Sequence, residues 1–264
     1  MVERFLSTTP EEQREKFYRL VSVHDLVSLL EYDYGYLVYH IYKTPDAQKY
    51  VNFELAKKTG GTRDISAPNK SLKFIQRKLN EVLSNVYHLK PITYGFVLGR
   101  DIVQNADKHK KKKWVFNVDI EDFFGAINFG RVRGMFMGKP YLLPESVATV
   151  LAQICVHDNK LPQGAPTSPV ISNMLCAKMD SELQDLAWKR RCYCTRYADD
   201  ITFSTTLSEL PKAIAEVHNL KSVLGVKVGD ELRQVIEGNG FSINQKKVRI
   251  YSSQVRQEVT GLTV

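Results

Sequence analysis

Apolar residues recur every three or four positions in several stretches of the chain, and this spacing predicts helices because it gathers apolar side chains on one face. Ser168 stands before Pro169 at the start of one such stretch, so we expect Ser168 to be the N-cap and Pro169 the first helical residue. The predicted helices cover most of residues 11–43, then 70–87, 145–157, 168–190 and 209–238, the last interrupted near Gly225–Gly229.

Other stretches alternate between apolar and polar residues, which is typical of strands. Trp114–Asp119 alternates and ends on a carboxylate. Two further stretches form a predicted hairpin around the tip Ala198–Asp200. Helices and strands interleave without strict alternation, so the pattern favours an α+β fold over a doubly wound parallel sheet. Besides Trp114–Asp119, the predicted strands are Tyr50–Ala56, Thr62–Ala67, Tyr193–Tyr197, Ile201–Thr205, Phe241–Ile250 and Glu258–Val264.

The composition narrows the class of protein. Of the 264 residues, 43% are hydrophobic and 25% are charged, which are ordinary globular values. No segment reaches the roughly 18 apolar residues of a membrane span, and the acidic N-terminus does not resemble a secretory signal. The four cysteines form no CxxC pair, which argues against a zinc finger or a disulfide framework and fits a reducing cytoplasm. A net charge of +8 gives weak support for a polyanionic partner.

Three aspartates are the main candidates for chemistry. Asp119 ends one predicted strand, and Asp199 and Asp200 lie at a hairpin tip with apolar, β-branched flanks. Adjacent carboxylates are ordinary in a solvated turn, but in a packed sheet they repel one another unless a cation holds them. Carboxylate oxygens favour Mg²⁺, and two such ions about 3.5–4 Å apart can clamp an in-line phosphoryl displacement. The pattern therefore indicates nucleotidyl transfer.

The sequence around these aspartates resembles that of reverse transcriptases. Tyr197–Asp200 is similar to their YxDD signature, and Phe116–Phe124 is similar to their first catalytic strand. Leu161–Pro169 resembles the loop and helix start that lie between these two motifs. The three segments have the family's order and spacing, and the resemblance extends from about residue 50 onward.

Two shorter patches resemble bacterial retron reverse transcriptases in particular. Asn105–His109 is similar to their NAxxH element, and Val259–Gly261 is similar to their VTG element. The lysine run that follows the first patch would by itself be a solvated loop, but within the resemblance we hypothesise that it grips RNA phosphates. The residues expected to contact nucleic acid are Asn105, His109, Lys110, Lys111, Lys112, Lys113, Val259, Thr260 and Gly261.

The resemblance implies a metal-binding role for the carboxylates. Asp119 and Asp199 would be ligands of two Mg²⁺ ions, and the backbone carbonyl of Ile120 would be a further ligand. Asp200 would adjust the site and ligate less directly. All three aspartates would then be catalytic residues.

The resemblance also implies a pocket for a deoxynucleoside triphosphate. Phe124 lies where the family places an aromatic ring that excludes a ribose 2′-OH, and simple core packing beside Phe123 is the alternative. Gln163 and Gly164 would line the same pocket, since glycine permits a close approach of the backbone.

Several cations are expected near the phosphates of that nucleotide. Arg63 matches the family arginine that binds the triphosphate, a bidentate task suited to guanidinium. Lys57 or Lys58 could assist it. Lys247 matches the family lysine that could protonate the pyrophosphate, with the adjacent Lys246 as a competitor for this role.

The implied architecture is a right-hand polymerase, with an antiparallel palm sheet packed on helices. The fingers would comprise residues 1–95, including the N-terminal region, and 127–167. The palm would comprise residues 96–126, with the retron-like insertion, and 168–255. Residues 256–264 would end the primer grip, so the thumb would be absent or truncated.

The implied function is that of a retron-type RNA-directed DNA polymerase in the bacterial cytoplasm, with no membrane partner. It would copy part of its own structured noncoding RNA into single-stranded DNA, priming from a guanosine 2′-OH and leaving a branched product. An effector protein and a role in anti-phage defence are expected with it. The alternatives are another bacterial reverse transcriptase, of intron-encoded or abortive-infection type, and a catalytically silent RNA-binding scaffold.

Overall fold

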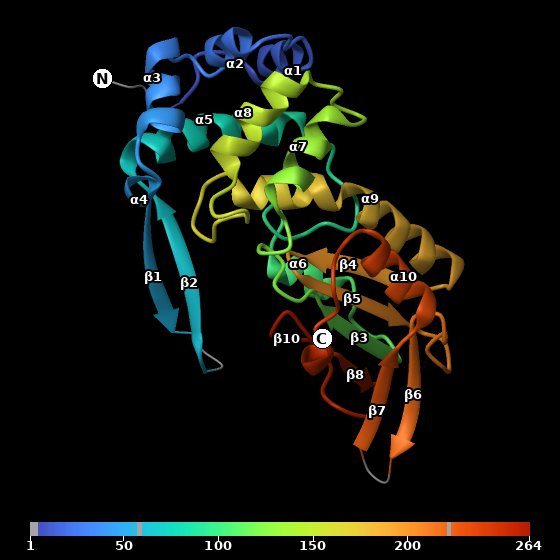
Figure 1. Ribbon diagram of the computed structural model, residues 1–264. Helices are drawn as coiled ribbons and strands as arrows, with labels where there is room; N and C mark the ends of the chain where they lie inside the picture. Colours follow the sequence, from blue (N-terminus) through green and yellow to red (C-terminus); the bar gives the residue numbers. More distant parts are fainter. Residues whose placement is uncertain (1–4, 57–59, 221–222) are drawn as a thin grey trace. The chain divides into compact units, whose positions relative to one another are not determined.

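The computed structural model describes residues 5–56, 60–220 and 223–264 (Figure 1). The chain divides into two compact units. The first unit comprises residues 1–87 and 127–175, and the second comprises residues 88–126 and 176–264. No helix within the described ranges is long and apolar enough to cross a membrane.

Helices and one hairpin build the first unit. Its core includes the apolar stripe of α5 (Lys70–Val86), in which Ile75 and Leu79 are fully buried. The hairpin pairs β1 (Tyr50–Ala56) with β2 (Thr62–Pro68) in antiparallel register. The remaining elements are α1 (Pro10–Tyr18), α2 (Val23–Leu29), α3 (Tyr34–Val38), the π-helix η1 (Tyr39–Lys43), α4 (Asp46–Lys49), α7 (Phe129–Met137), α8 (Glu145–Cys155) and the beginning of α9 (Ser168–Lys189).

Capping side chains divide the N-terminal region into separate short helices. Thr9 and Glu12 form a capping box at the start of α1, and Ser22 and Asp25 form another at the start of α2. Each box satisfies backbone N–H groups that a helix start leaves without partners. Residues 11–43 are therefore largely helical, as predicted, but they form several short helices.

Helix α9 begins one residue earlier than predicted. Ser168 is its first residue, and the carbonyl of Thr167 accepts a hydrogen bond from the N–H of Ile171 at 3.0 Å. The Ser168 hydroxyl donates instead to the carbonyl of Pro162 at 2.8 Å. Ser168 thus closes the preceding loop onto the helix, and the prediction that it is the N-cap is wrong.

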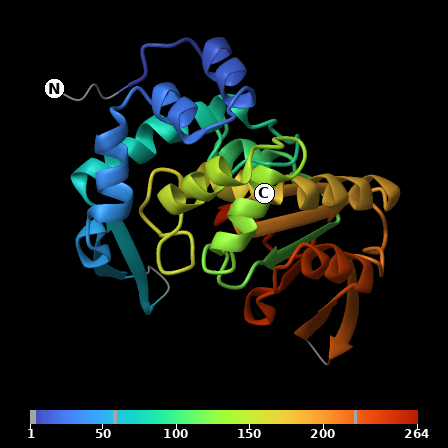
Figure 2. The same ribbon diagram turned by 45° about the horizontal axis from the view of Figure 1, so that its top comes forward.

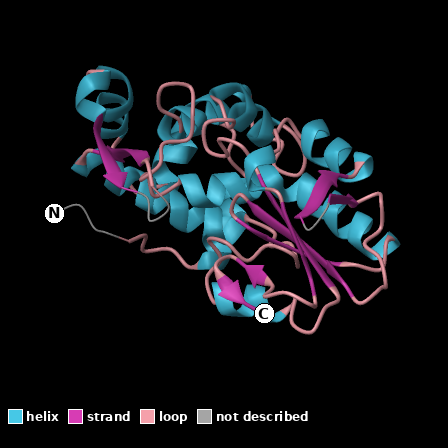
Figure 3. Ribbon diagram, turned by 90° about the horizontal axis from the view of Figure 1, so that it is seen from below, coloured by secondary structure: helices cyan, strands magenta, loops and turns pink. Residues whose placement is uncertain are grey.

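A four-stranded antiparallel sheet lies at the centre of the second unit (Figure 3). Its order is β4 (Tyr193–Tyr197), β5 (Asp200–Thr205), β3 (Trp114–Asp119) and β8 (Arg249–Ser252). The part of α9 that belongs to this unit runs along the sheet (Figure 2). The other elements are α6 (Ile102–Asp107), β6 (Ala215–Leu220), β7 (Val223–Val228), α10 (Asp230–Gly238), the 3₁₀ turn η2 (Gln245–Lys247), β9 (Glu258–Val259) and β10 (Leu262–Thr263). The predicted α+β class is confirmed.

Two element predictions in this unit are wrong. The predicted helix over residues 209–238 is the β6–β7 hairpin followed by α10. β-Branched residues favour strands, and Val217 pairs with Val226 across this hairpin. Most of the predicted strand Phe241–Ile250 is turn, in which Ile243 forms an isolated bridge before β8 begins.

Candidate active site

Strand pairing brings Asp119 and Asp200 together. Asp119 ends β3, Asp200 begins β5, and the antiparallel register sets the two residues opposite each other. The register is well determined because Val118 and Ile201 are buried beside them, and a shift of one residue would turn such side chains to the other face. Two of the three predicted carboxylates therefore meet on neighbouring strands of one packed sheet.

Asp199 lies in the two-residue turn between β4 and β5. Its carbonyl accepts a hydrogen bond from the N–H of Ile120 at 3.0 Å, which ties the turn to the end of β3. Ala198, the other turn residue, has a φ of 57° in the left-handed region. Asp200 is the first residue of β5 and not part of the hairpin tip, because it pairs with Tyr197.

Two side chains from the η2 region bind the buried carboxylate of Asp119. Lys247 Nζ donates to Oδ2 at 2.7 Å, and Asn244 Nδ2 donates to Oδ1 at 3.2 Å. The backbone N–H of Asn244 also donates to the carbonyl of Asp119 at 2.9 Å. The structure thus places Lys247, not its competitor Lys246, on the carboxylate. Asn244 was missed from the sequence, although an amide three residues before Lys247 in the same turn could have suggested it.

The charges of this cluster act on one another. Burial raises the pKa of Asp200 to about 7, with further increases from the charges of Asp199 and Asp119 and a partial offset from Lys247. Burial lowers the pKa of Lys247, but its hydrogen bond to Asp119 and the three aspartate charges outweigh this effect and raise it. The aspartate cluster is therefore electronegative and favours cations.

The donor atoms at this cluster suit a divalent metal ion, because they are hard carboxylate and carbonyl oxygens. Within the described residues, no group of three or more His, Cys, Asp or Glu side chains is arranged to hold a metal. Asp119 is instead paired with Lys247. The residues fit a metal in chemistry, and a cage made of all three aspartates would require side-chain movement.

Phe124 lies close to this cluster in sequence and is only partly buried. Its ring centroid is 5.3 Å from that of Phe123 and 6.1 Å from that of Phe96. Phe123 is buried and stacks on Phe241 at 5.7 Å. Phe123 is therefore a core residue. Phe124 remains partly exposed, which is compatible with the predicted contact to a sugar.

The remaining predicted nucleotide-binding residues lie in the first unit. The carbonyl of Gln163 accepts a hydrogen bond from the N–H of Ser66 at 2.8 Å, which docks its loop on β2. Gly164 has a φ of 121°, and a Cβ there would lie 3.0 Å from the side chain of Ile65. Arg63 is an exposed residue of the same strand. Lys57 and Lys58 lie outside the described residues.

The two retron-like patches contact each other, and much of them is buried. Asn105 Nδ2 donates to Thr260 Oγ1 at 3.3 Å, and the side chains of Asn105, His109 and Val259 are at most 1% exposed. The structure does not support the prediction that these three residues contact nucleic acid directly, because buried side chains cannot reach a phosphate. Thr260 and Gly261 keep some exposure.

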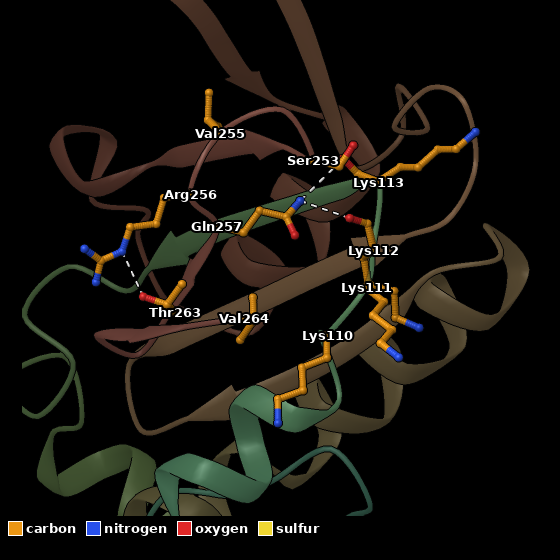
Figure 4. A pocket seen from close by; sticks show the side chains of 10 residues that line it. All are labelled: Lys110, Lys111, Lys112, Lys113, Ser253, Val255, Arg256, Gln257, Thr263 and Val264. Carbon is orange, nitrogen blue, oxygen red and sulfur yellow. Dashed lines mark hydrogen bonds between the residues drawn. The ribbon is translucent and has the colours of Figure 1, made fainter.

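Lys110–Lys113 borders a cavity of about 570 Å³, which residues near Val264 also line (Figure 4). The side chain of Gln257 donates to the backbone carbonyl of Lys112 at 3.1 Å and of Lys113 at 3.4 Å. The ammonium of Lys112 lies 3.6 Å from the centroid of the Tyr193 ring. The lysine run thus has a fixed backbone, with side chains that spread around the rim of the cavity (Figure 4).

Sequence comparison places these features among known proteins. The profile of the family described as reverse transcriptase (RNA-dependent DNA polymerase) matches residues 55–264. Retron Mx162 reverse transcriptase of Myxococcus xanthus is 37% identical over 239 residues, covering 83% of this chain and 47% of that relative. Retron Ec86 reverse transcriptase of Escherichia coli is 34% identical over 202 residues, covering 76% of this chain and 58% of that relative. The chain spans about half the length of the curated relatives it matches.

Solved structures show a likeness in fold. Telomerase from Candida albicans, in complex with the TWJ fragment of telomeric RNA, has a TM-score of 0.52 at 12% identity, covering 91% of this chain and 48% of its own. Telomerase from Candida tropicalis, with the same fragment, also has a TM-score of 0.52 at 12% identity. These likenesses and the profile match support the right-hand polymerase fold. The chain therefore belongs to the reverse transcriptase (RNA-dependent DNA polymerase) family, and within that family its sequence resembles the bacterial retron reverse transcriptases.

Proposed function

We propose that the chain acts as a retron-type RNA-directed DNA polymerase, which copies part of a structured noncoding RNA into single-stranded DNA. The observation that carries this proposal is the β3–β5 register, which sets Asp119 opposite Asp200 with Asp199 in the adjoining turn. Nucleotidyl transfer depends on such a group of carboxylates, because the charge of the transferred phosphate has to be countered by cations that they hold.

Reverse transcriptases use divalent metal ions, and we propose two Mg²⁺ ions here because the available donors are hard oxygens. Asp119, Asp199 and the carbonyl of Ile120 would hold them, and Asp200 would contribute less directly. Bound ions of this kind activate the attacking hydroxyl and stabilise the leaving group. Lys247 would donate a proton to the pyrophosphate, since its ammonium is protonated and lies on Asp119 at the cluster.

Four residues are proposed to contact the incoming deoxynucleotide: Arg63, Phe124, Gln163 and Gly164. Arg63 would bind the triphosphate through its guanidinium. Gln163 and Gly164 would line the pocket, in a loop that β2 holds by the bond from Ser66. The exposed part of Phe124 would exclude a ribose 2′-OH by its bulk.

The proposed partners are the structured RNA, its DNA product and an effector protein in anti-phage defence. The fixed, basic surface of Lys110–Lys113 would follow the RNA backbone, because ammonium groups bind phosphates without reading sequence. Priming from a guanosine 2′-OH and a cytoplasmic location belong to the same proposal. They are supported by the resemblance to retron enzymes.

The test is primer extension with the intact protein on its co-purified RNA, with Mg²⁺ and dNTPs, and with Asp199→Asn as the control. We expect DNA from the wild type and none from the variant, with equal RNA retained by both. Equal DNA from both, or no DNA from either while RNA is retained, would refute the polymerase function. A product that is not joined to RNA through a 2′-OH would point to another type of bacterial reverse transcriptase.

A further inference from the structure

Arg196 and Asp180 form an ion pair in the interior of the second unit. Both side chains are 0% exposed, and the guanidinium binds the carboxylate through two hydrogen bonds of 2.6 and 2.7 Å. The Asp180 carboxylate also accepts a hydrogen bond from the Thr93 hydroxyl at 2.8 Å. Buried ion pairs add little stability relative to apolar packing, so the geometry of this pair is more informative than its charge.

The guanidinium has a further contact, which reaches the catalytic turn. Arg196 Nη1 donates to the carbonyl of Ala198 at 3.0 Å. That carbonyl belongs to the peptide that joins Ala198 to Asp199, so the bond fixes the orientation of this peptide. The carbonyl of Asp199 is itself held by the N–H of Ile120. Both peptide groups that flank the Asp199 side chain are therefore fixed by residues outside the turn.

The chain around Gly95 packs against the same turn. The N–H of Tyr94 donates to the carbonyl of Arg196 at 2.8 Å, so this segment runs along the outer edge of β4. A Cβ at Gly95 would lie only 2.4 Å from the backbone nitrogen of Ala198 and 3.0 Å from the carbonyl carbon of Tyr197. Only glycine fits at this approach, so the turn is confined there by backbone.

The turn needs such confinement because of its conformation. Ala198 has a φ of 57°, which an L-residue other than Asn or Asp adopts reluctantly. Strained backbone of this kind persists where the surrounding structure determines it. We propose that Arg196, anchored by Asp180, is a positioning residue that holds the Ala198–Asp199 peptide and thereby keeps the Asp199 carboxylate at the cluster with Asp119 and Asp200. This inference rests on the proposed function, since it assumes that the cluster binds divalent ions.

The test compares Arg196→Lys with the wild type in the intact protein. A lysine keeps the positive charge, but its single nitrogen cannot replace the three guanidinium nitrogens that bind Asp180 and the Ala198 carbonyl. We expect kcat to fall roughly 10- to 100-fold while the KM for dNTP changes little, because the reacting groups are misplaced and not removed. Mn²⁺ binding, followed by electron paramagnetic resonance without substrate, should weaken in parallel.

Leu183→Ala is the matched control, because Leu183 is fully buried on the same helix as Asp180. It should lower the melting temperature but leave Mn²⁺ binding and kcat unchanged at a temperature where the protein is folded. A folded Arg196→Lys protein with wild-type kcat and Mn²⁺ affinity would refute the positioning role. The same losses in Leu183→Ala would refute it too, since they would reflect stability alone.

Gly95→Ala provides an independent variant, which disturbs Ala198 while leaving the Arg196–Asp180 pair intact. It should reproduce the loss of kcat and of Mn²⁺ affinity, and it decides the question if Arg196→Lys does not fold. Wild-type protein that binds Mn²⁺ but makes no DNA, with binding weakened in both variants, would refute the proposed function and uphold the positioning role. A wild type that makes DNA, with wild-type kcat and Mn²⁺ affinity in both variants, would support the proposed function and refute the positioning role.

Discussion

Lys247 donates a hydrogen bond from Nζ to Oδ2 of Asp119 at 2.7 Å, so a cation from the η2 turn is bound to the last residue of β3. About half of the Lys247 side chain remains exposed, whereas that of Asp119 is 6% exposed. The lysine therefore reaches the acid cluster from its open side, where an incoming substrate would also approach. The adjacent Lys246 is exposed and provides a natural comparison.

Lys247→Met should lower kcat by roughly 100-fold or more, because it removes the proposed proton donor to the leaving pyrophosphate. Lys246→Met should change kcat little. Single-turnover primer extension measures both rates. Equal effects of the two substitutions, or a wild-type rate in Lys247→Met, would contradict the assigned role.

Phe124→Val should reduce the preference for dNTPs over ribonucleotides by about tenfold or more, because the smaller side chain leaves room for a 2′-OH. The measurement is the ratio of kcat/KM for a dNTP to that for the matching ribonucleotide. Phe123→Leu is the control, since Phe123 is buried and stacks on Phe241. This control should reduce stability and leave the ratio unchanged. A ratio that Phe124→Val leaves unchanged, or that Phe123→Leu changes equally, would contradict the proposed role of Phe124.

Replacing Lys110–Lys113 with glutamine should weaken RNA binding for all sequences and flatten the plot of log K against log salt. Each lost contact with a single-stranded phosphate should reduce the slope by about 0.7. The control removes four lysine charges from other positions in the second unit. An unchanged slope in the test variant, or equal flattening in the control, would exclude a phosphate grip. The control lysines, replaced together by glutamine, are Lys178, Lys189, Lys212 and Lys227.

His109 should make the protein less stable in acid. Burial, with help from the charge of Lys112, lowers the pKa of His109 from 6.5 to about 3, and its ring nitrogens bond to the hydroxyls of Ser204 and Thr195. Below pH 6.5 the unfolded chain takes up a proton at this residue that the folded chain does not. Stability is therefore full above pH 6.5 and is progressively lost as the pH falls toward 3, by about 2 kcal/mol at pH 5.

Denaturation of wild type and His109→Gln between pH 4.5 and 8 measures this effect. The variant should be less stable at neutral pH, but its free energy of unfolding should fall less steeply as the pH is lowered. An identical acid dependence in both proteins would mean that other groups cause it.

Strands β3 and β4 could be predicted from sequence residue by residue, and β5 to within one residue, because their local pattern and their tertiary environment agree. Trp114–Asp119 alternates, and the alternation matches a sheet that buries Val115 and Phe116 completely. The three aspartates were found for a similar reason, since carboxylates that follow apolar strands are conspicuous. The pairing of Asp119 with Lys247 was not foreseen, because it joins residues from distant parts of the sequence.

Other elements and buried residues could not be predicted, because they depend on tertiary contacts that the order of apolar and polar residues does not reveal. The apolar spacing in residues 209–238 fits a helix as well as a strand, and the pairing of β6 with β7 decides between them. Asn105 and His109 are polar and stand beside a lysine run, which suggests a surface. They are nevertheless buried: both ring nitrogens of His109 bond to the hydroxyls of Ser204 and Thr195, and Asn105 Nδ2 donates to Thr260 Oγ1, while Asn105 Oδ1 has no hydrogen-bond partner.

The pairing of Asp119 with Asp200 has a consequence for how the acid cluster forms during folding. These residues belong to strands that are distant in sequence, so the acid cluster does not exist until β3 and β5 have paired. Non-local pairing of this kind is slow, because the chain loses the entropy of closing a long loop before the stabilising contacts between the strands have formed. Amides of the interior strand β3, such as those of Val115 and Phe116, should be among the slowest to exchange with solvent. The acid cluster would therefore form in the same cooperative step as the four-stranded sheet.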